Sequence, residues 1–246
     1  MGTRTQVEIG KVWDATSDPP PAALPDGVVH LWQRSLQAPD AAVEACYEVL
    51  SAEERERAHR FRIERPRREF VLTRGTLRSL LAHYLAITPQ EIRFRYTKHG
   101  KPLLDTPGDL RFNVSHSGDL ALMAFVKGRE VGVDVEKVVP QTEVEQLAER
   151  FFSARERSDL RNFSGEELRA AFFRCWTRKE AYIKAKGEGL SLPLDQFDVS
   201  IAIDDRDALL ATRPDSSEAG RWTLCDIRTS PGYAGALAVG DGGEKS

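Results

Sequence analysis

The stretches VGVDVEKV (131–138) and CWTRKEAYIKAKGEGL (175–190) decide how this chain of 246 residues folds. In the first, valines alternate with other residues, which is the two-residue period of a β-strand. Residues two apart on a strand share a face, so Asp134 and Glu136 point the same way while the valines pack behind them. We therefore predict a strand that presents two acids on one face.

The second stretch has the periodicity of a helix, because Trp176, Glu180 and Lys184 recur at about one-turn spacing. A carboxylate buried alone is costly, whereas three carboxylates that converge form a site for a hard cation. We predict that Glu180 joins Asp134 and Glu136 in such a site. Lys184, one turn beyond, would help to hold a phosphorylated ligand, and Trp176 is expected to anchor the helix in the core.

The composition excludes several classes of protein. Hydrophobic residues make up 41% and charged residues 30%, as in a soluble globular protein, and the net charge of −3 gives no overall basic field for nucleic acid. Three widely spaced cysteines match neither a metal site nor a disulfide framework. Because no signal-peptide core and no membrane-length apolar run is visible, we expect a cytoplasmic protein with no membrane partner.

The first half is expected to contain an irregular lead-in followed by strands and helices. Ser51 and Glu54 mark a helix start, as the N-cap and the N3 residue of a capping box. The expected elements are an irregular segment over 1–27, a strand at 28–36, a helix from Ser51 to Phe61, a helix after Pro66, a strand over 92–104 that turns at His99-Gly100, and a hairpin of 110–116 with 120–126.

The second half repeats this order of elements. After the strand at 131–138 we expect two short helices, the second capped by Ser153 with Glu156 at N3, then a long helix at about 165–186 and strands at 197–203, 222–227 and 236–240. This order predicts an α+β fold of two similar α/β lobes, 28–127 and 128–240, with a disordered tail over 241–246. The repeat is one of element order, without visible sequence identity between the halves.

Four segments together resemble the Sfp-type 4′-phosphopantetheinyl transferases. They are FNVSHSGDLALMAF (112–125), VGVDVEKV (131–138), RFFSARERSDL (150–160) and FFRCWTRKEAYIKAKGEGLSLPLDQFDV (172–199). The resemblance covers about residues 50–240, and its GxDxE strand followed by WxxKEAxxKxxGxGL is specific. It implies transfer of the phosphopantetheine arm of coenzyme A to a serine of an apo carrier protein. It also implies a monomer with a pseudo-twofold, two-lobed fold, the coenzyme between the lobes, and Mg²⁺ or possibly Mn²⁺ as cofactor.

The resemblance assigns the catalytic and metal-binding residues. Asp134, Glu136 and Glu180 match the metal-binding acids of the family, and Glu180 also matches the general base that takes the serine proton. Lys184 matches a phosphate-contacting lysine. These residue types suit the reaction, because displacement at a pyrophosphate needs negative charge to be neutralised on the bridging and leaving oxygens.

The resemblance also assigns residues to coenzyme binding. Lys101 matches a second phosphate-contacting lysine, and Ser115 and His116 match a phosphate-binding Ser-His pair. Arg57 aligns where related proteins have a basic residue against the 3′-phosphate, and Arg60 lies one turn away. Arginine can bind phosphate oxygens in a two-pronged manner, so this exchange of residue is chemically sound.

Two positions depart from the family pattern. Phe70 falls where some relatives have a phosphate-contacting threonine, and Glu54 falls where some have lysine. Recognition of the 3′-phosphate is therefore expected to differ in detail. Arg57, Arg60 and Arg68 are the candidates to compensate.

Two rival functions are weighed against this one. A non-catalytic protein that binds coenzyme A would have no need to keep three acids together with Lys184. A nucleic-acid-binding protein could use the arginines crowded into 55–78, but the negative net charge and the lack of interleaved aromatic residues count against it. These motifs do not encode which carrier or pathway is served, or whether Mg²⁺ or Mn²⁺ is preferred.

Overall fold

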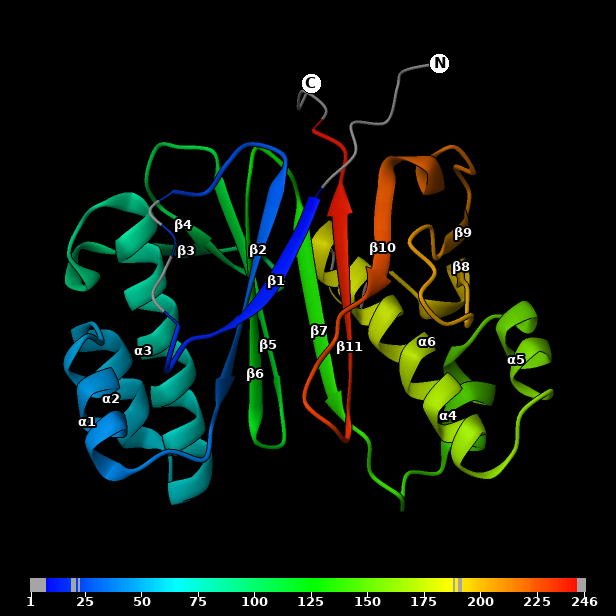
Figure 1. Ribbon diagram of the computed structural model, residues 1–246, viewed down its shortest axis with the longest axis horizontal. Coiled ribbons are helices and arrows are strands. Elements are labelled where there is room, and N and C mark those ends of the chain that lie inside the picture. The colour runs from blue at the N-terminus through cyan, green and yellow to red at the C-terminus, as the bar shows by residue number, and fades with distance from the viewer. Residues whose placement is uncertain (1–7, 19–20, 22, 188, 190–191, 243–246) are drawn as a thin grey trace.

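The computed structural model describes residues 8–18, 21, 23–187, 189 and 192–242. Two lobes lie side by side, each with a sheet toward the centre of the molecule and helices on its outer side (Figure 1). The predicted α+β fold of two similar α/β halves is confirmed.

The N-terminal lobe has a four-stranded sheet in the order β1-β2-β6-β5. Its strands are β1 (Glu8–Asp14), β2 (Val28–Ser35), β5 (Leu110–Ser117) and β6 (Leu120–Lys127). The helices on its outer side are α1 (Asp40–Glu48), α2 (Ala52–Arg60) and α3 (Glu64–Leu85). A hairpin of β3 (Phe94–Tyr96) and β4 (Pro102–Leu104) follows α3.

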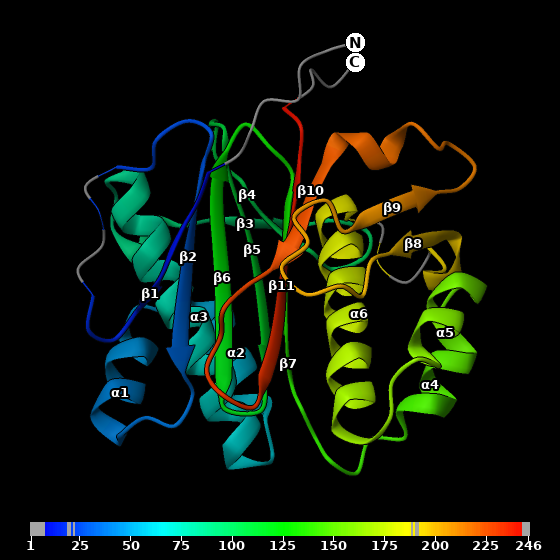
Figure 2. The same cartoon turned by 45° about the vertical axis from the view of Figure 1, so that its right-hand side comes forward.

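The C-terminal lobe has a three-stranded sheet in the order β10-β11-β7. Its strands are β7 (Val131–Lys137), β10 (Trp222–Asp226) and β11 (Tyr233–Gly240). The helices are α4 (Val144–Phe151), α5 (Ala154–Leu160) and α6 (Gly165–Lys186), and β8 (Phe197–Val199) pairs with β9 (Leu209–Thr212). Figure 2 shows α6 beside β7, with α4 and α5 on the other side of this long helix.

Several elements differ from the predictions. The lead-in expected to be irregular contains β1, which pairs in parallel with β2, and neither α1 nor β9 was expected. The strand expected over 92–104 is two short strands on either side of a turn, and the strand expected over 197–203 ends at Val199. Each of the short strands is decided by pairing with a partner strand, which local pattern does not reveal. The expected disordered tail over 241–246 lies mostly outside the described residues.

Apolar side chains from both sheets form one core between the lobes. Leu31 and Leu122 from the N-terminal sheet and Val133 and Leu237 from the C-terminal sheet are all buried in it. In the separate core of the C-terminal lobe, Trp176 is partly buried and its ring centroid lies 6.2 Å from that of Phe152, the residue after α4, as expected for an anchor of α6. Among the described residues, no helix combines the length and the apolar composition needed to cross a bilayer.

Side chains of β5 join the two sheets where the lobes meet. Among the described strands, β7 pairs only with β11 in its sheet, which leaves the backbone N–H groups of its other edge in need of partners. Asn113 Oδ1 accepts a bond from the N–H of Val133 at 2.9 Å, and Ser117 Oγ accepts one from the N–H of Lys137 at 3.1 Å. Ser115 lies between them on the same face of β5. These side chains therefore fix the position of β7 relative to β5 along the strand direction.

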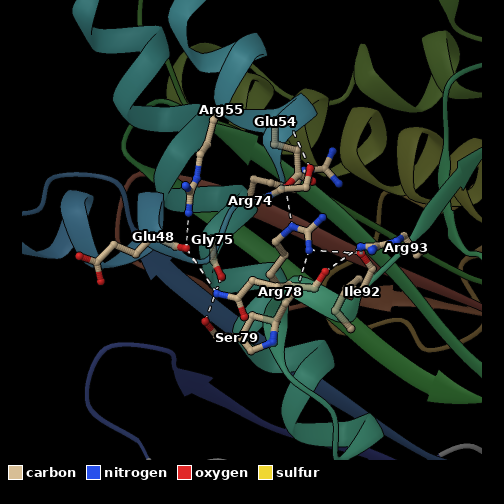
Figure 3. Close-up of polar contacts among 12 residues, drawn as sticks. Glu48, Glu54, Arg55, Arg74, Gly75, Arg78, Ser79, Ile92 and Arg93 are labelled. Atoms are coloured by element: carbon tan, nitrogen blue, oxygen red, sulfur yellow. Dashed lines mark hydrogen bonds and ion pairs between the residues drawn. The ribbon is translucent and has the colours of Figure 1, made fainter.

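A buried glutamate anchors the long helix of the N-terminal lobe. Glu54 completes the predicted capping box with Ser51, and its carboxylate also contacts the guanidinium of Arg78 on α3 (Figure 3). Arg78 in turn donates bonds to the carbonyls of Pro89, at 2.5 Å, and Ile92, at 3.3 Å. Glu54 is therefore committed to the interior of the lobe.

Candidate active site

The two elements that carry the predicted acids lie in direct backbone contact. A Cβ atom added at Gly132 on β7 would lie 2.1 Å from the carbonyl oxygen of Ala181 and 2.4 Å from the backbone nitrogen of Ala185. Only glycine allows α6 to approach the strand this closely. This contact brings Glu180 of the helix to the same side of the sheet as Asp134.

Asp134 is the centre of the polar cluster. Its carboxylate is buried, and its Oδ1 atom accepts bonds from Ser115 Oγ at 2.9 Å and from Lys184 Nζ at 2.5 Å. Lys184 also donates to Ser115 Oγ at 2.8 Å. The predicted neighbour of Lys184 along the helix, Glu180, is thus not its hydrogen-bond partner here. The other oxygen of Asp134, Oδ2, is buried without a hydrogen-bond partner among the described residues.

The other two acids are affected by the same cluster. Burial raises the pKa of Glu136, although a bond of 2.7 Å from Ser117 Oγ lowers it, and the neighbouring charge of Asp134 raises it. Burial also raises the pKa of Glu180, and the charge of Asp134 adds to this rise. Lys184 opposes both shifts. The three carboxylates are buried or half-buried and lie close enough to interact, so a positive charge placed among them is stabilised.

The donor set fits a hard cation, although the side chains are not arranged around one. In the described part of the chain, no group of three His, Cys, Asp or Glu side chains is close enough to hold a metal ion as the structure stands. The ammonium of Lys184 instead contacts Asp134. Carboxylate oxygens are the ligands that Mg²⁺ prefers, and the unpartnered Asp134 Oδ2 is an available donor. Asp134, Glu136 and Glu180 are therefore suitable ligands after side-chain rotation.

A cavity of about 290 Å³ opens beside this cluster, between the two lobes. Glu180 and Lys184 line it from α6, Asn113 lines it from β5, and the β3–β4 turn with Lys101 lines it from the N-terminal lobe. The ammonium of Lys101 donates to backbone carbonyls of the C-terminal lobe, including that of Lys184 at 2.7 Å. Both lobes thus contribute to one cavity.

The predicted Ser-His pair is divided between the two faces of β5. Ser115 is buried in the acidic cluster, whereas His116 is exposed on the opposite face. Although much of the residue is exposed, neighbouring atoms partly desolvate the His116 imidazole and so lower its pKa, and the charge of Glu69 on α3 opposes this. Adjacent residues on a strand point to opposite sides, so one ligand group cannot contact both side chains unless it reaches the end of the strand.

The arginines predicted to bind the 3′-phosphate lie on helices α2 and α3 of the N-terminal lobe. Arg57 places its guanidinium 4.9 Å from the ring centroid of Phe70, and Arg60 is exposed at the end of α2. Arg68 donates to Asp40 at 2.5 Å and to the carbonyl of Ala38 at 2.6 Å. None of the three arginines is among the described residues that line the cavity beside Glu180. Arg68 is engaged with the start of α1, which leaves Arg57 and Arg60 as the accessible cations.

Sequence reasoning missed two features of this site. The pattern N-x-S-x-S over 113–117 is visible in the sequence, but its partner, the backbone edge of β7, is not. Gly132 carries no sequence signal other than its place before Asp134, yet it determines the contact between β7 and α6.

Comparisons with known proteins agree with this architecture. Residues 32–127 match the family described as 4′-phosphopantetheinyl transferase, N-terminal, and residues 130–238 match the 4′-phosphopantetheinyl transferase superfamily. The chain is 37% identical over 225 residues to the 4′-phosphopantetheinyl transferase HetI of Nostoc sp., which covers 90% of this chain and 91% of that protein. It is 35% identical over 193 residues to the 4′-phosphopantetheinyl transferase Sfp of Bacillus subtilis, which covers 77% and 82%. The chain therefore belongs to the 4′-phosphopantetheinyl transferase family and is an enzyme of that activity.

Proposed function

We propose that this enzyme transfers the 4′-phosphopantetheine group of coenzyme A to a serine of an apo acyl or peptidyl carrier protein, in a magnesium-dependent reaction. The observation that carries the proposal is the cluster of Asp134, Ser115 and Lys184 beside a cavity to which both lobes contribute. Glu136 and Glu180 lie beside this cluster, and the charge of Asp134 raises the pKa of each.

The reaction needs a group that accepts the serine proton, and Glu180 on α6 is the proposed acceptor. The carrier serine Oγ would attack the β-phosphorus of coenzyme A as the bond from that phosphorus to the bridging oxygen breaks. The bond pair leaves with 3′,5′-adenosine diphosphate, and Glu180 takes the serine proton. Glu180 lines the cavity from α6, and a carboxylate kept out of bulk water is better suited to accept a proton than an exposed one.

Asp134, Glu136 and Glu180 would bind the metal ion. Magnesium held by these carboxylates would neutralise charge on the pyrophosphate, and manganese accepts the same oxygen donors. The unpartnered Asp134 Oδ2 supports this assignment, because a buried carboxylate oxygen without a donor costs free energy unless a cation meets it.

The remaining predicted residues, with the exception of Lys101, would bind the coenzyme. Lys184 and Ser115 lie together at the acidic cluster and would contact the pyrophosphate. His116 would bind phosphate from the other face of β5. Arg57 and Arg60, which are exposed on α2, would contact the 3′-phosphate at the nucleotide end.

A single chain would form the complete site, because the cavity is lined by residues of both lobes. We therefore propose that the enzyme acts as a monomer. Light scattering at assay concentration should give the mass of one chain. A larger assembly that loses activity on dissociation would contradict the monomer.

Mass spectrometry of apo carrier proteins tests the proposed reaction. The enzyme is incubated with coenzyme A, Mg²⁺ and an acyl or a peptidyl carrier, and each carrier is weighed. We expect a gain of one phosphopantetheine group, which should disappear when the acceptor serine is replaced by alanine or when the metal is chelated. Transfer that persists in chelator would contradict the metal dependence.

A further inference from the structure

Lys101 is presented to the C-terminal lobe by a tightly bonded turn. Between β3 and β4, the N–H of Thr97 donates to the carbonyl of Lys101 at 3.0 Å, and the N–H of Lys101 donates to Thr97 Oγ1 at 3.1 Å. Gly100 has a φ of +82°, a conformation that favours glycine. These bonds fix the direction in which the Lys101 side chain leaves the N-terminal lobe.

The ammonium of Lys101 contacts the backbone of both elements that carry the acids. Nζ donates to the carbonyls of Lys184 at 2.7 Å and Ala185 at 3.2 Å, in the last turn of α6. It also donates to the carbonyl of Val131, the first residue of β7, at 3.2 Å. The side chain is only 10% exposed, and the carboxylate of Glu130 lies 3.9 Å from Nζ.

These contacts satisfy groups that a helix leaves without partners. The last carbonyls of an α-helix have no intrahelical donor, and they form the negative end of the helix dipole. A buried ammonium with three N–H donors is well matched to three carbonyl acceptors, and bonds from a charged donor are stronger than neutral ones. One side chain of the N-terminal lobe thus ties α6 to β7 in the C-terminal lobe.

We propose that Lys101 is a positioning residue that sets the separation of the two acid-bearing elements. Its three carbonyl contacts lie at the end of the α6–β7 interface where Gly132 brings the two backbones together. Loss of the ammonium lets the last turn of α6 move away from β7, and this moves Glu180 and Lys184 relative to Asp134. The effect on catalysis rests on the proposed function, whereas the effect on the local backbone does not.

This inference differs from the phosphate contact that the sequence led us to expect for Lys101. A phosphate ligand would have to take the ammonium away from the carbonyls that now hold it, whereas a positioning residue keeps those bonds when coenzyme A is bound. Removing the ammonium therefore has two separable consequences. A positioning role affects the backbone of α6 and β7, and a contact role affects the affinity for coenzyme A.

The first test is hydrogen–deuterium exchange of the Lys101→Met variant, which keeps most of the side-chain length but removes the charge and the donors. The matched control is Lys98→Met, at an exposed position of the same turn. We expect exchange at least about tenfold faster in peptides covering 131–137 and 181–187, the effect expected from the loss of even one charge-assisted bond. Peptides of α3 and the control variant should exchange as wild type does. Unchanged exchange, or exchange raised equally in α3, would overturn the local role.

The second test separates binding from turnover. Calorimetric titration with coenzyme A in chelator should give an affinity for Lys101→Met within about twofold of wild type, while kcat for transfer falls about tenfold or more. A weakened affinity with normal exchange would show that Lys101 contacts phosphate, and normal kcat with faster exchange would show that positioning is unnecessary. Either result overturns the proposal. If wild type itself transfers nothing, the proposed function fails, and the exchange result still stands.

Discussion

Glu54 and Glu156 occupy equivalent places in the two lobes and have equivalent partners. Each is the buried N3 glutamate of a capping box, and each pairs with a buried cation on the long helix of its lobe. For Glu156 that cation is Lys179, at 2.7 Å, which also donates to the carbonyls of Leu194 at 2.6 Å and Phe197 at 2.7 Å. Figure 3 shows the counterpart around Glu54.

This pair of networks reveals a residue-level repeat that the sequence alone does not show. In both lobes the cation of the long helix goes on to bind two carbonyls of the segment that follows that helix. The capping box, the long helix and the following segment are therefore linked by the same device in each half. We infer that the halves share more than the order of their elements.

Breaking the buried Glu156–Lys179 pair by removing one partner should be strongly destabilising. Lys179→Met leaves a buried carboxylate without its cation, so we expect the free energy of unfolding to fall by about 3–5 kcal/mol. The double variant Glu156→Gln/Lys179→Met should lose less than the sum of its single variants. Urea denaturation measures both. As a control, Arg157→Ala breaks the exposed pair with Glu149, 3.0 Å apart, and should cost less than about 1 kcal/mol. Equal losses at the two sites would refute the account of the buried pair.

Part of this fold is predictable from sequence because local chemistry determines it. The capping boxes at Ser51 and Ser153, the strand β7 and the helix α6 all follow from short-range patterns, and each is found where expected. In contrast, β1 depends on pairing with the edge of β2, which no local pattern reports.

The site shows the same limit. Asp134, Glu136 and Glu180 can be named from their motifs, but the contact of Lys184 with Asp134 joins residues 50 positions apart. From sequence, the nearest acid for Lys184 is Glu180, one turn away on the same helix. Packing of α6 on β7 at Gly132 places Lys184 beside Asp134 instead. This is a tertiary contact, which the local sequence pattern does not report.

Gly132→Ala tests whether the backbone contact between β7 and α6 supports the site. The added Cβ would overlap the backbone of Ala181, so α6 must move; we expect a loss of about 1–3 kcal/mol or more in unfolding free energy. Transfer by the folded fraction should also fall. Gly220→Ala is the matched control, because nothing lies within 4 Å of its added Cβ. A variant as stable and active as this control would show that the close approach is unimportant.

Arg57→Ala should weaken recognition of the nucleotide end of coenzyme A. Because the 3′-phosphate is remote from the reacting phosphorus, KM for coenzyme A should rise about tenfold or more while kcat changes little. Steady-state kinetics with coenzyme A and with dephospho-coenzyme A provide the measurement. With dephospho-coenzyme A, wild type and Arg57→Ala should have similar KM values, because the 3′-phosphate is absent. Arg67→Ala, which breaks an exposed pair with Glu64, should behave as wild type with both compounds. An Arg57→Ala enzyme that still prefers coenzyme A as strongly as wild type does would exclude Arg57 from this contact.

Lys184→Met should increase the affinity of the free enzyme for Mn²⁺. The Lys184 ammonium contacts Asp134 Oδ1, so a metal ion must compete with it, and its removal should tighten binding by about tenfold. Electron paramagnetic resonance of Mn²⁺ measures this without any turnover. Lys137→Met, whose ammonium bonds Asp119 at 3.2 Å, controls for loss of a nearby positive charge. Equal gains in the two variants would mean that Lys184 acts only through its general field.

Glu180→Gln tests the central assignment most directly, because it keeps the side-chain length and one oxygen ligand but cannot accept the serine proton. Binding of coenzyme A with Mg²⁺ is titrated calorimetrically, and transfer to an apo carrier is assayed in parallel. The account predicts near-normal binding with transfer reduced about 10²–10⁴-fold, the usual contribution of a positioned base. Transfer near the wild-type rate would contradict it, because the proton acceptor would then be another group.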